Sequence, residues 1–370
     1  MFRTLLLPMV IAVTASTKAH AQDTVIYRPD EVGNSLEAGA VLQFRYIGSF
    51  RRELASPDDE EAIGFNFRRL RLRLGGTTAD GKAGFFFQTE HADGRSELLD
   101  AYGTLELAEG VRFRFGQFRL PFQREITVSA AKQLTADRAS LTNNLNPTSG
   151  IRTQGLELRL SNDTTRASFV FSDGTASINE SFNSEDDGIA GTVRLELTPI
   201  GTLGPFSQIT APRGTPRGLL IGLAGHGEQR EAGGDRWAFA ADVTYQHDGF
   251  NIGVIGAGHV AEDLNLGPDP QAESAYGIIA QGGLYLTERF EPFARYQWGT
   301  SSDDDEADLH VVTAGFNYYF VGQALRFVAD AGYAFDDIGP TFERESEGLL
   351  PTASGDEGTF TFRTQLQMLF

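Results

Sequence analysis

Residues 360–370 alternate between apolar and polar side chains and close on an aromatic residue, Phe370. Alternation with a period of two predicts a β-strand with one apolar face. An outer-membrane β-barrel presents such a face to lipid along its closing strand. The C-terminal segment therefore restricts the expected folds to a barrel that closes on its last strand.

Residues 1–21 are typical of a secretory signal peptide, with Arg3 as the basic start, 5–13 as the apolar stretch and Ala-His-Ala at 19–21 as the cleavage site. We therefore expect an exported protein. Without Arg3 and Lys18 the chain keeps 29 of its 31 basic residues against 50 acidic ones, a formal net charge of −21. That balance disfavours nucleic acid as a partner. The absence of cysteine excludes disulfides and thiolate chemistry.

Beyond the signal, no apolar run reaches the roughly 18 residues of a transmembrane helix. A membrane-spanning form must then be a closed barrel, because only closure leaves no strand edge unpaired in lipid. Alternating segments of about ten residues recur along the chain and predict an all-β, transmembrane antiparallel β-barrel of about sixteen strands, with about fourteen or eighteen as alternatives. The expected strands lie near 37–51, 64–75, 82–91, 97–107, 111–119, 151–160, 165–172, 188–198, 218–226, 236–247, 250–260, 273–286, 290–299, 309–320, 324–335 and 358–370.

This pattern divides the chain into a signal peptide over 1–21, a short periplasmic N-terminal segment over 22–36 and a transmembrane barrel over 37–370. The connections expected on the periplasmic side are short and the outer ones longer, which is the asymmetry of such barrels. The Pro/Gly-rich segment 199–217 is the exception, a long connection on the inner side with no role assigned by the sequence.

The third outer connection, 120–150, is the longest, and we expect it to fold into the pore and constrict it. The loop contains three cations, Arg124, Lys132 and Arg138, and two anions, Glu125 and Asp137. Arg119 adds a fourth cation at the rim just before the loop. Arg124 and Lys132 are expected near the constriction. The alternative is an ordinary solvated surface loop.

Lumen-facing positions are rich in arginine. In Leu-Arg-Leu-Arg-Leu over 70–74 the leucines face lipid and turn Arg69, Arg71 and Arg73 inward. The same alternation turns Arg112 and Arg114 inward. Because guanidinium is always charged and binds oxyanions bidentately, a column of arginines without an acid in its own strand predicts a path for anions.

The alternative role for such arginines is to brace the wall by pairing with carboxylates. Arg159 and Arg194 have Glu157 and Glu196 two residues away on the same face, so bracing is the better interpretation there. Asp100 also has lumen parity.

Three motifs lie in sequence order: Phe-Arg-Arg-Leu-Arg-Leu-Arg-Leu-Gly at 67–75, Asp-Ala-Tyr at 100–102 and Gly-Gln-Phe-Arg-Leu-Pro-Phe at 116–122. Together they resemble the phosphate-selective porin O and P family. The resemblance implies a trimeric outer-membrane channel, in some members for phosphate or polyphosphate, constricted by the third outer loop. The expected pore-lining, anion-binding residues are Arg69, Arg71, Arg73, Asp100, Arg112, Arg114, Arg124 and Lys132.

Two departures argue against strict phosphate specificity. The outer loop 227–235 has no lysine cluster to collect anions. Acidic runs on four outer loops, at 58–61, 185–187, 303–306 and 343–347, are expected to repel phosphate at the mouth.

The sequence does not favour an enzyme. The histidines are scattered, with neither H-E-x-x-H spacing for a metal nor a G-x-S-x-G nucleophile elbow. The Gly-rich stretch 253–258 resembles a dinucleotide loop, but it lies inside an alternating segment. We therefore expect no cofactor and no metal site.

The leading hypothesis is a passive porin for small anions in the outer membrane of a Gram-negative bacterium. The alternatives are a non-specific general porin, or an envelope-structural barrel whose acidic loops bridge lipopolysaccharide through divalent cations. Expected partners are outer-membrane lipid, lipopolysaccharide, small anionic solutes and two further copies of the chain. A homotrimer would pack through outward Gly/Ala-rich patches at 253–258 and 329–332.

Overall fold

The computed structural model describes residues 24–27, 34–52, 60–78, 81–174, 178–179, 188–230, 234–263, 271–302, 308–335, 338, 341–350 and 357–370. The expected signal peptide at 1–21 lies outside these residues, as do the acidic runs at 185–187 and 303–306 and the first half of the run at 58–61.

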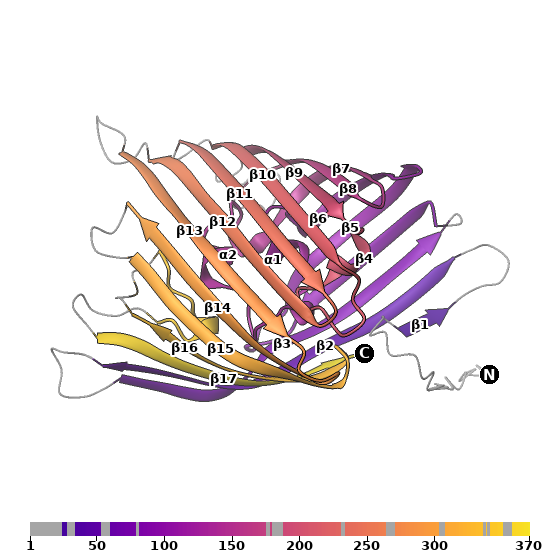
Figure 1. Cartoon of the computed structure of the whole chain (residues 1–370). Coiled ribbons are helices and arrows are strands. Elements are labelled where there is room, and N and C mark those ends of the chain that lie inside the picture. Colours follow the sequence, from indigo (N-terminus) through magenta and orange to yellow (C-terminus); the bar gives the residue numbers. More distant parts are fainter. Residues whose placement is uncertain are drawn as a thin grey trace, which may run out of the picture.

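Sixteen antiparallel strands form a closed barrel, which confirms the predicted fold class (Figure 1). The ring closes where β17 pairs with β2, from Phe360 opposite Phe50 to Leu369 opposite Val41. The strands are β2 (Ser35–Arg52), β3 (Glu60–Thr78), β4 (Ala83–Glu90), β5 (Glu97–Ala108), β6 (Val111–Arg119), β7 (Arg152–Ser161), β8 (Thr165–Ser172), β9 (Gly188–Ile200), β10 (Gly218–Arg230), β11 (Asp235–His247), β12 (Phe250–Asp263), β13 (Gln271–Leu284), β14 (Phe290–Ser301), β15 (Asp308–Val321), β16 (Leu325–Ala334) and β17 (Glu357–Leu369).

A further short strand, β1 (Thr24–Tyr27), pairs with residues 36–38 of β2. That edge of β2 is free because β17 pairs only from Val41 onward. The backbones of Ala40 and Phe370 exchange two hydrogen bonds, of 3.0 and 3.1 Å, at the end of the β17 ladder. The N-terminal strand and the C-terminus therefore lie side by side at the periplasmic end of β2.

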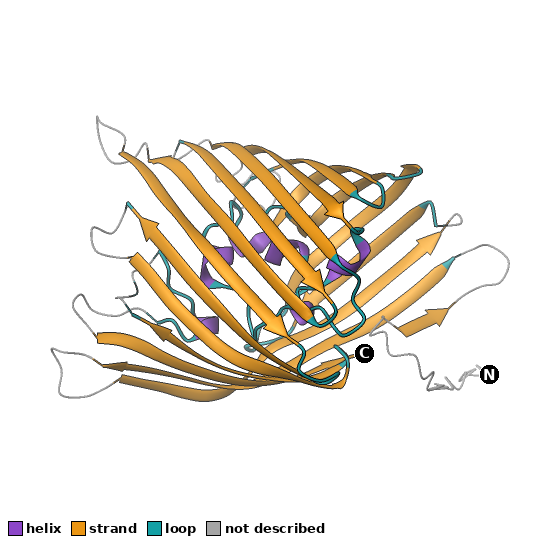
Figure 2. Ribbon diagram, viewed as in Figure 1, coloured by secondary structure: helices purple, strands orange, loops and turns teal. Residues whose placement is uncertain are grey.

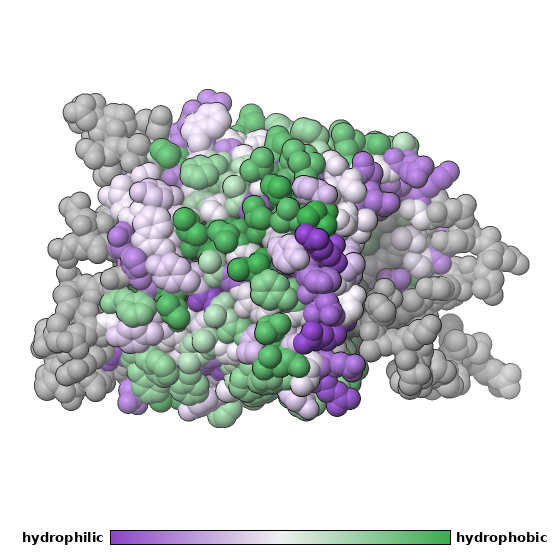
Figure 3. Space-filling view, in the orientation of Figure 1, coloured by the Kyte–Doolittle hydropathy of each residue, from purple (hydrophilic) through white to green (hydrophobic). Residues whose placement is uncertain are grey.

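The outer wall is apolar because successive side chains alternate between lipid and lumen. On β3, for example, Phe65 and Leu72 are exposed on the lipid side while Arg69 is buried within the barrel. On the face seen in Figure 3, apolar side chains gather between the two ends of the barrel. This pattern is the one the alternating sequence predicted.

A β-bulge interrupts the alternation on β3. Gln43 of β2 lies opposite Arg69, whereas the next residue, Phe44, lies opposite Phe67, so Arg68 is the extra residue. Phe67 still faces outward, and both Arg68 and Arg69 reach Asp137 inside the barrel. Strict alternation would have turned Arg68 toward lipid, so the bulge adds one arginine to the lumen.

The third outer connection folds into the barrel, as expected. It carries the short helices α1 (Arg124–Thr127), η1 (Ala130–Lys132), α2 (Ser140–Asn144) and η2 (Ser149–Ile151), which lie within the ring of strands in Figure 2. Leu120, Phe122, Leu134 and Leu145 are fully buried in it. None of the described helices is long and apolar enough to cross a membrane.

The long inner connection, whose role the sequence left open, packs against this loop from the periplasmic side. It contains η3 (Gly204–Ser207). The backbone N–H of Ile209 donates to the carbonyl of Lys132 at 3.0 Å, and the Ile209 side chain joins an apolar cluster with Val128 and Leu134. The connection is therefore a support for the loop inside the barrel.

The outer segment 341–350 packs against the same loop. Ser140 Oγ donates to the Phe342 carbonyl at 2.8 Å, and the Ser140 N–H donates to the Glu347 carboxylate at 3.1 Å. Glu347 also pairs with Arg295. The acidic run 343–347, expected on an outer loop at the mouth, thus contributes one buried carboxylate, Glu347, to the barrel interior.

Candidate pore lining

The loop 120–151 is fastened to one side of the barrel. Its backbone carbonyls accept hydrogen bonds from wall side chains on β15, β16 and β17, among them Asn317 to Leu134 at 2.9 Å and Arg326 to Gln133 at 2.6 Å. Val328 of β16 packs against Leu134 in the same apolar cluster. The loop therefore fills the lumen on this side, and the three lumenal cavities described below are lined mainly by the wall from β3 to β9.

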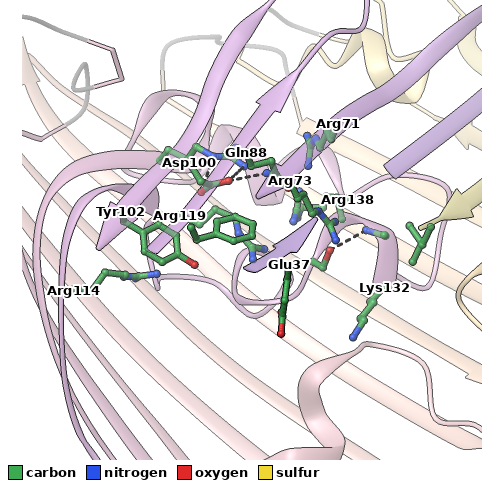
Figure 4. Close-up of a pocket in the computed structure, with 16 residues that line it drawn as sticks. Glu37, Arg71, Arg73, Gln88, Asp100, Tyr102, Arg114, Arg119, Lys132 and Arg138 are labelled. Atoms are coloured by element: carbon green, nitrogen blue, oxygen red, sulfur yellow. Dashed lines mark hydrogen bonds and ion pairs between the residues drawn. The ribbon is translucent and has the colours of Figure 1, made fainter. Parts of the chain in front are cut away.

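The inner cavity, of about 430 Å³, lies between the loop and strands β3 to β7 (Figure 4). Seven cationic side chains line it against two carboxylates, a formal excess of five positive charges. The cations are Arg71, Arg73, Arg114, Arg119, Lys132, Arg138 and Arg152, and the carboxylates are Glu37 and Asp100. In a confined wall of low dielectric, such an excess attracts anions.

Two of these cations, Arg119 and Arg138, form no ion pair with a carboxylate among the residues that the structure describes. Arg119 donates to the carbonyls of Ile126 and Val128, at 3.0 and 2.9 Å. Arg138 donates to the carbonyls of Glu125 and Val128, at 2.8 and 2.9 Å. Carbonyl acceptors position these guanidinium groups without cancelling their charge, so both leave a positive field in the cavity.

Asp100 is the main anion of the cavity and is already paired. Arg152 donates to both of its oxygens, at 3.0 and 3.2 Å, and Gln88 donates to it at 2.7 Å. Gln88 also accepts from Arg73 at 3.1 Å. Asp100 therefore orients the surrounding cations rather than binding an anion itself.

A larger outer cavity, of about 830 Å³, shares Arg71, Arg138 and Arg152 with the inner one. These three arginines thus stand where the two cavities meet. Arg71 pairs with Glu90 at 2.6 Å, on the neighbouring strand β4. A solute that crossed from one cavity to the other at this point would pass this group.

Asp137 is a buried acidic residue of the loop. Arg69 pairs with it at 2.8 Å, Arg68 pairs with it as well, and Arg45 lies at 3.7 Å. Burial alone would favour its neutral form, but the guanidinium groups of Arg68 and Arg69 outweigh burial and hold the pKa of Asp137 well below its usual range. Asp137 is therefore ionised and ties the loop to β3.

A third cavity, of about 220 Å³, shares Arg114 and Arg119 with the inner one and extends along β7 to β9. Arg159 pairs with Glu157 at 2.9 Å and Arg194 pairs with Glu196 at 3.2 Å. These two wall-bracing pairs are the ones expected from the sequence. Arg114 also pairs with Glu157, at 2.6 Å.

The structure separates the expected pore-lining residues into groups. Arg71, Arg73, Asp100, Arg114 and Lys132 line the inner cavity, and Arg69 lines the outer one, paired to Asp137.

Two of the expected residues take other positions. Arg112 is exposed at the periplasmic end of β6, where it pairs with Glu106 at 2.9 Å, and it lines none of the three cavities. Arg124, expected near the constriction, lines none of the three cavities. Its buried guanidinium donates to the carbonyls of Phe206 and Gln208 in the inner connection.

Arg68, Arg119, Arg138 and Arg152 line the cavities but were absent from the expected set. Arg68 could have been found: the outward residues change from odd positions, at Phe65 and Phe67, to even positions from Leu70 onward, which indicates an intervening bulge. No local pattern distinguishes Arg138, which faces the cavities, from Arg124, which does not.

Residues 42–213 match the family described as phosphate-selective porin O and P, and the three motifs at 67–75, 100–102 and 116–122 lie within that range. The comparison with curated proteins returns no match. An anion-selective porin from Comamonas acidovorans matches with a TM-score of 0.64 and 13% identity, over 91% of this chain and 100% of its own. The outer membrane channel DcaP of Acinetobacter baumannii matches with a TM-score of 0.62 and 10% identity, over 93% and 99%. OmpT of Vibrio cholerae, in a trimer form, matches with a TM-score of 0.62 and 11% identity, over 90% of this chain and 99% of its own. At such identities the likeness concerns the fold.

Proposed function

We propose that the chain is an outer-membrane channel of the phosphate-selective porin O and P family, which residues 42–213 match, and that it lets small anions diffuse passively through its cationic lumen. The inner cavity carries this proposal, because seven cations and two carboxylates surround a space of about 430 Å³ on the side that the loop leaves open. The anion-selective porin of Comamonas acidovorans, which shares the fold, is consistent with it.

Coulomb's law indicates how strongly each cation acts. For unit charges about 6 Å apart in water the attraction is about 0.7 kcal/mol, which raises the local anion population about threefold. The acidic outer runs act from exposed loops and are screened within about 8 Å at physiological salt. The lumenal arginines should therefore decide the selectivity, with phosphate among the anions that pass rather than the sole substrate.

The test is the reversal potential of the purified protein in a planar bilayer under a potassium chloride gradient. We expect chloride to be preferred over potassium. The double variant Arg73→Gln and Lys132→Gln removes two cations from the inner cavity and should lower the chloride-to-potassium permeability ratio by at least about tenfold, because each lost charge lowers the chloride population about threefold and raises the potassium population.

The matched control is Arg112→Gln with Lys82→Gln. It removes the same two charge types from exposed positions at the periplasmic end, outside the three lumenal cavities. It should leave the permeability ratio nearly unchanged. A cation-preferring wild type would refute the anion channel, and equal shifts in both double variants would assign the selectivity to overall charge and favour a non-specific porin.

We further propose that the mature chain starts at residue 22 and that three copies assemble through outward small-residue patches at 253–258 and 329–332. A trimer form of the similarly folded OmpT supports the assembly. Mass spectrometry of the membrane-extracted protein tests the first proposal. Light scattering after gentle extraction tests the second, and a monomeric mass would contradict it. We also propose that the acidic outer loops contact lipopolysaccharide through bridging divalent cations.

A further inference from the structure

The outer cavity is lined by eight arginines, five carboxylates and the amides of three asparagines, so its formal charge excess is three positive charges. Arginines of β3 and the loop, including Arg68, Arg71 and Arg138, supply positive charge. The same cavity is lined by three uncharged amides, those of Asn143 and Asn144 on α2 and of Asn146 in the turn that follows it. A channel for inorganic anions needs only the positive charge of the arginines, so the amides point to an additional type of ligand group.

The oxygens of these amides offer hydrogen-bond acceptors. Asn146 Nδ2 donates to the carbonyl and to the hydroxyl of Thr148, both at 2.8 Å, which orients its amide. Its Oδ1 is buried and has no hydrogen-bond partner. Asn144 Nδ2 donates to the Thr341 carbonyl at 2.8 Å, and Asn143 Nδ2 donates to the Ala139 carbonyl at 3.1 Å. A buried acceptor without a partner costs free energy, which a ligand hydroxyl group would recover.

Arg138 supplies the charged end of such a site. It stands where the outer and inner cavities meet. Its guanidinium donates to the carbonyls of Glu125 and Val128 and forms no ion pair with a carboxylate within the described part of the chain, although the Glu125 carboxylate partly offsets its charge. Burial lowers the pKa of Arg138, and repulsion from Arg119 and Arg69 lowers it further. A bound carboxylate would offset both costs of keeping this guanidinium charged.

We infer that the outer cavity selects hydroxylated organic anions of the sugar-acid class, with the carboxylate at Arg138 and the hydroxyl groups on the amide oxygens of Asn143 and Asn146. The volume of about 830 Å³ lies within the range of roughly 300–1,000 Å³ typical of sites for small organic molecules. This inference rests on the proposed anion channel and specifies its substrate class.

The experiment compares gluconate with hexanoate, monoanions of equal chain length that differ in their hydroxyl groups. Each is added to the outer side of a bilayer that holds the wild-type protein, and its half-blocking concentration for the chloride current is measured. Gluconate should block at a concentration at least about fivefold lower, the effect of one net hydrogen bond. Protein-free bilayers control for direct effects of hexanoate on the lipid.

The double variant Asn143→Leu and Asn146→Leu should bring the two half-blocking concentrations within about twofold of each other. Asn162→Leu, an exposed amide at the periplasmic end, should keep the wild-type ratio. Equal block of the wild type by both probes would overturn the inference while leaving the chloride preference, and so the proposed function, intact. Because the wild-type comparison needs no variant, it decides the question even if the leucine variant does not fold.

Discussion

Arg69 and Asp137 form a buried ion pair of 2.8 Å that joins the wall strand β3 to the loop inside the barrel. Both side chains are almost inaccessible to solvent. Arg68, placed inward by the β-bulge, pairs with the same carboxylate. Asp137 thus neutralises part of the charge of the β3 arginines, which have no acidic residue near them in the sequence.

Replacing Asp137 by asparagine should destabilise the folded barrel by about 3 kcal/mol, because it leaves buried guanidinium groups without their anion. Equilibrium unfolding in urea with lipid vesicles measures the loss. Glu106→Gln, which breaks the exposed pair with Arg112, should cost less than about 1 kcal/mol. Equal costs for the two variants would mean that the Asp137 pair does not hold the loop.

The same pair predicts a pH dependence. Folding lowers the pKa of a carboxylate in such a pair, and its ionised form then stabilises the folded state. This contribution is complete above the unfolded pKa, about 3.9 for Asp, and is lost as the pH falls through the folded pKa. Because the pKa of Asp137 is held well below its usual range, the loop should stay anchored from pH 8 down to about pH 4. Single-channel current noise should therefore rise only in stronger acid. In Asp137→Asn the noise should be high at every pH, and a wild-type rise near pH 6 would contradict the assignment.

Glu347 should hold the loop from the outer side. It pairs with Arg295 and accepts from the backbone of Ser140 at 3.1 Å and from Gln297 at 3.2 Å. Glu347→Gln removes the charge from this buried network, so the loop should fluctuate and the mean single-channel conductance should rise. Glu343→Gln, an exposed acid on the same segment, is the control and should leave conductance unchanged. If both variants conduct alike, the outer segment does not restrain the loop.

Arg124 should hold the inner connection from within the barrel. Its contacts to the Phe206 and Gln208 carbonyls join the loop to that connection, and although burial lowers its pKa to about 10, it stays charged at neutral pH. Arg124→Ala should speed amide hydrogen exchange over residues 203–211 by about tenfold or more, as expected when a buried charge-assisted contact is lost. The exposed Arg213→Ala is the comparison. Unchanged exchange in both would show that the connection is held by its apolar contacts alone.

The sequence by itself determined the barrel, because alternation with a period of two is a local property that can be read along each strand. For that reason the sequence predicted that Arg71, Arg73 and Arg114 lie in the lumen. The outward positions change from odd at Phe67 to even at Leu70, which also indicates the β-bulge. Only the tertiary structure decided which cations keep their charge unneutralised. Asp137 lies 68 positions from Arg69, and the carbonyls bound by Arg124 lie 82 and 84 positions away. Such pairings arise when the loop packs inside the closed barrel, so no local pattern separates the cavity-lining Arg138 from the buried Arg124.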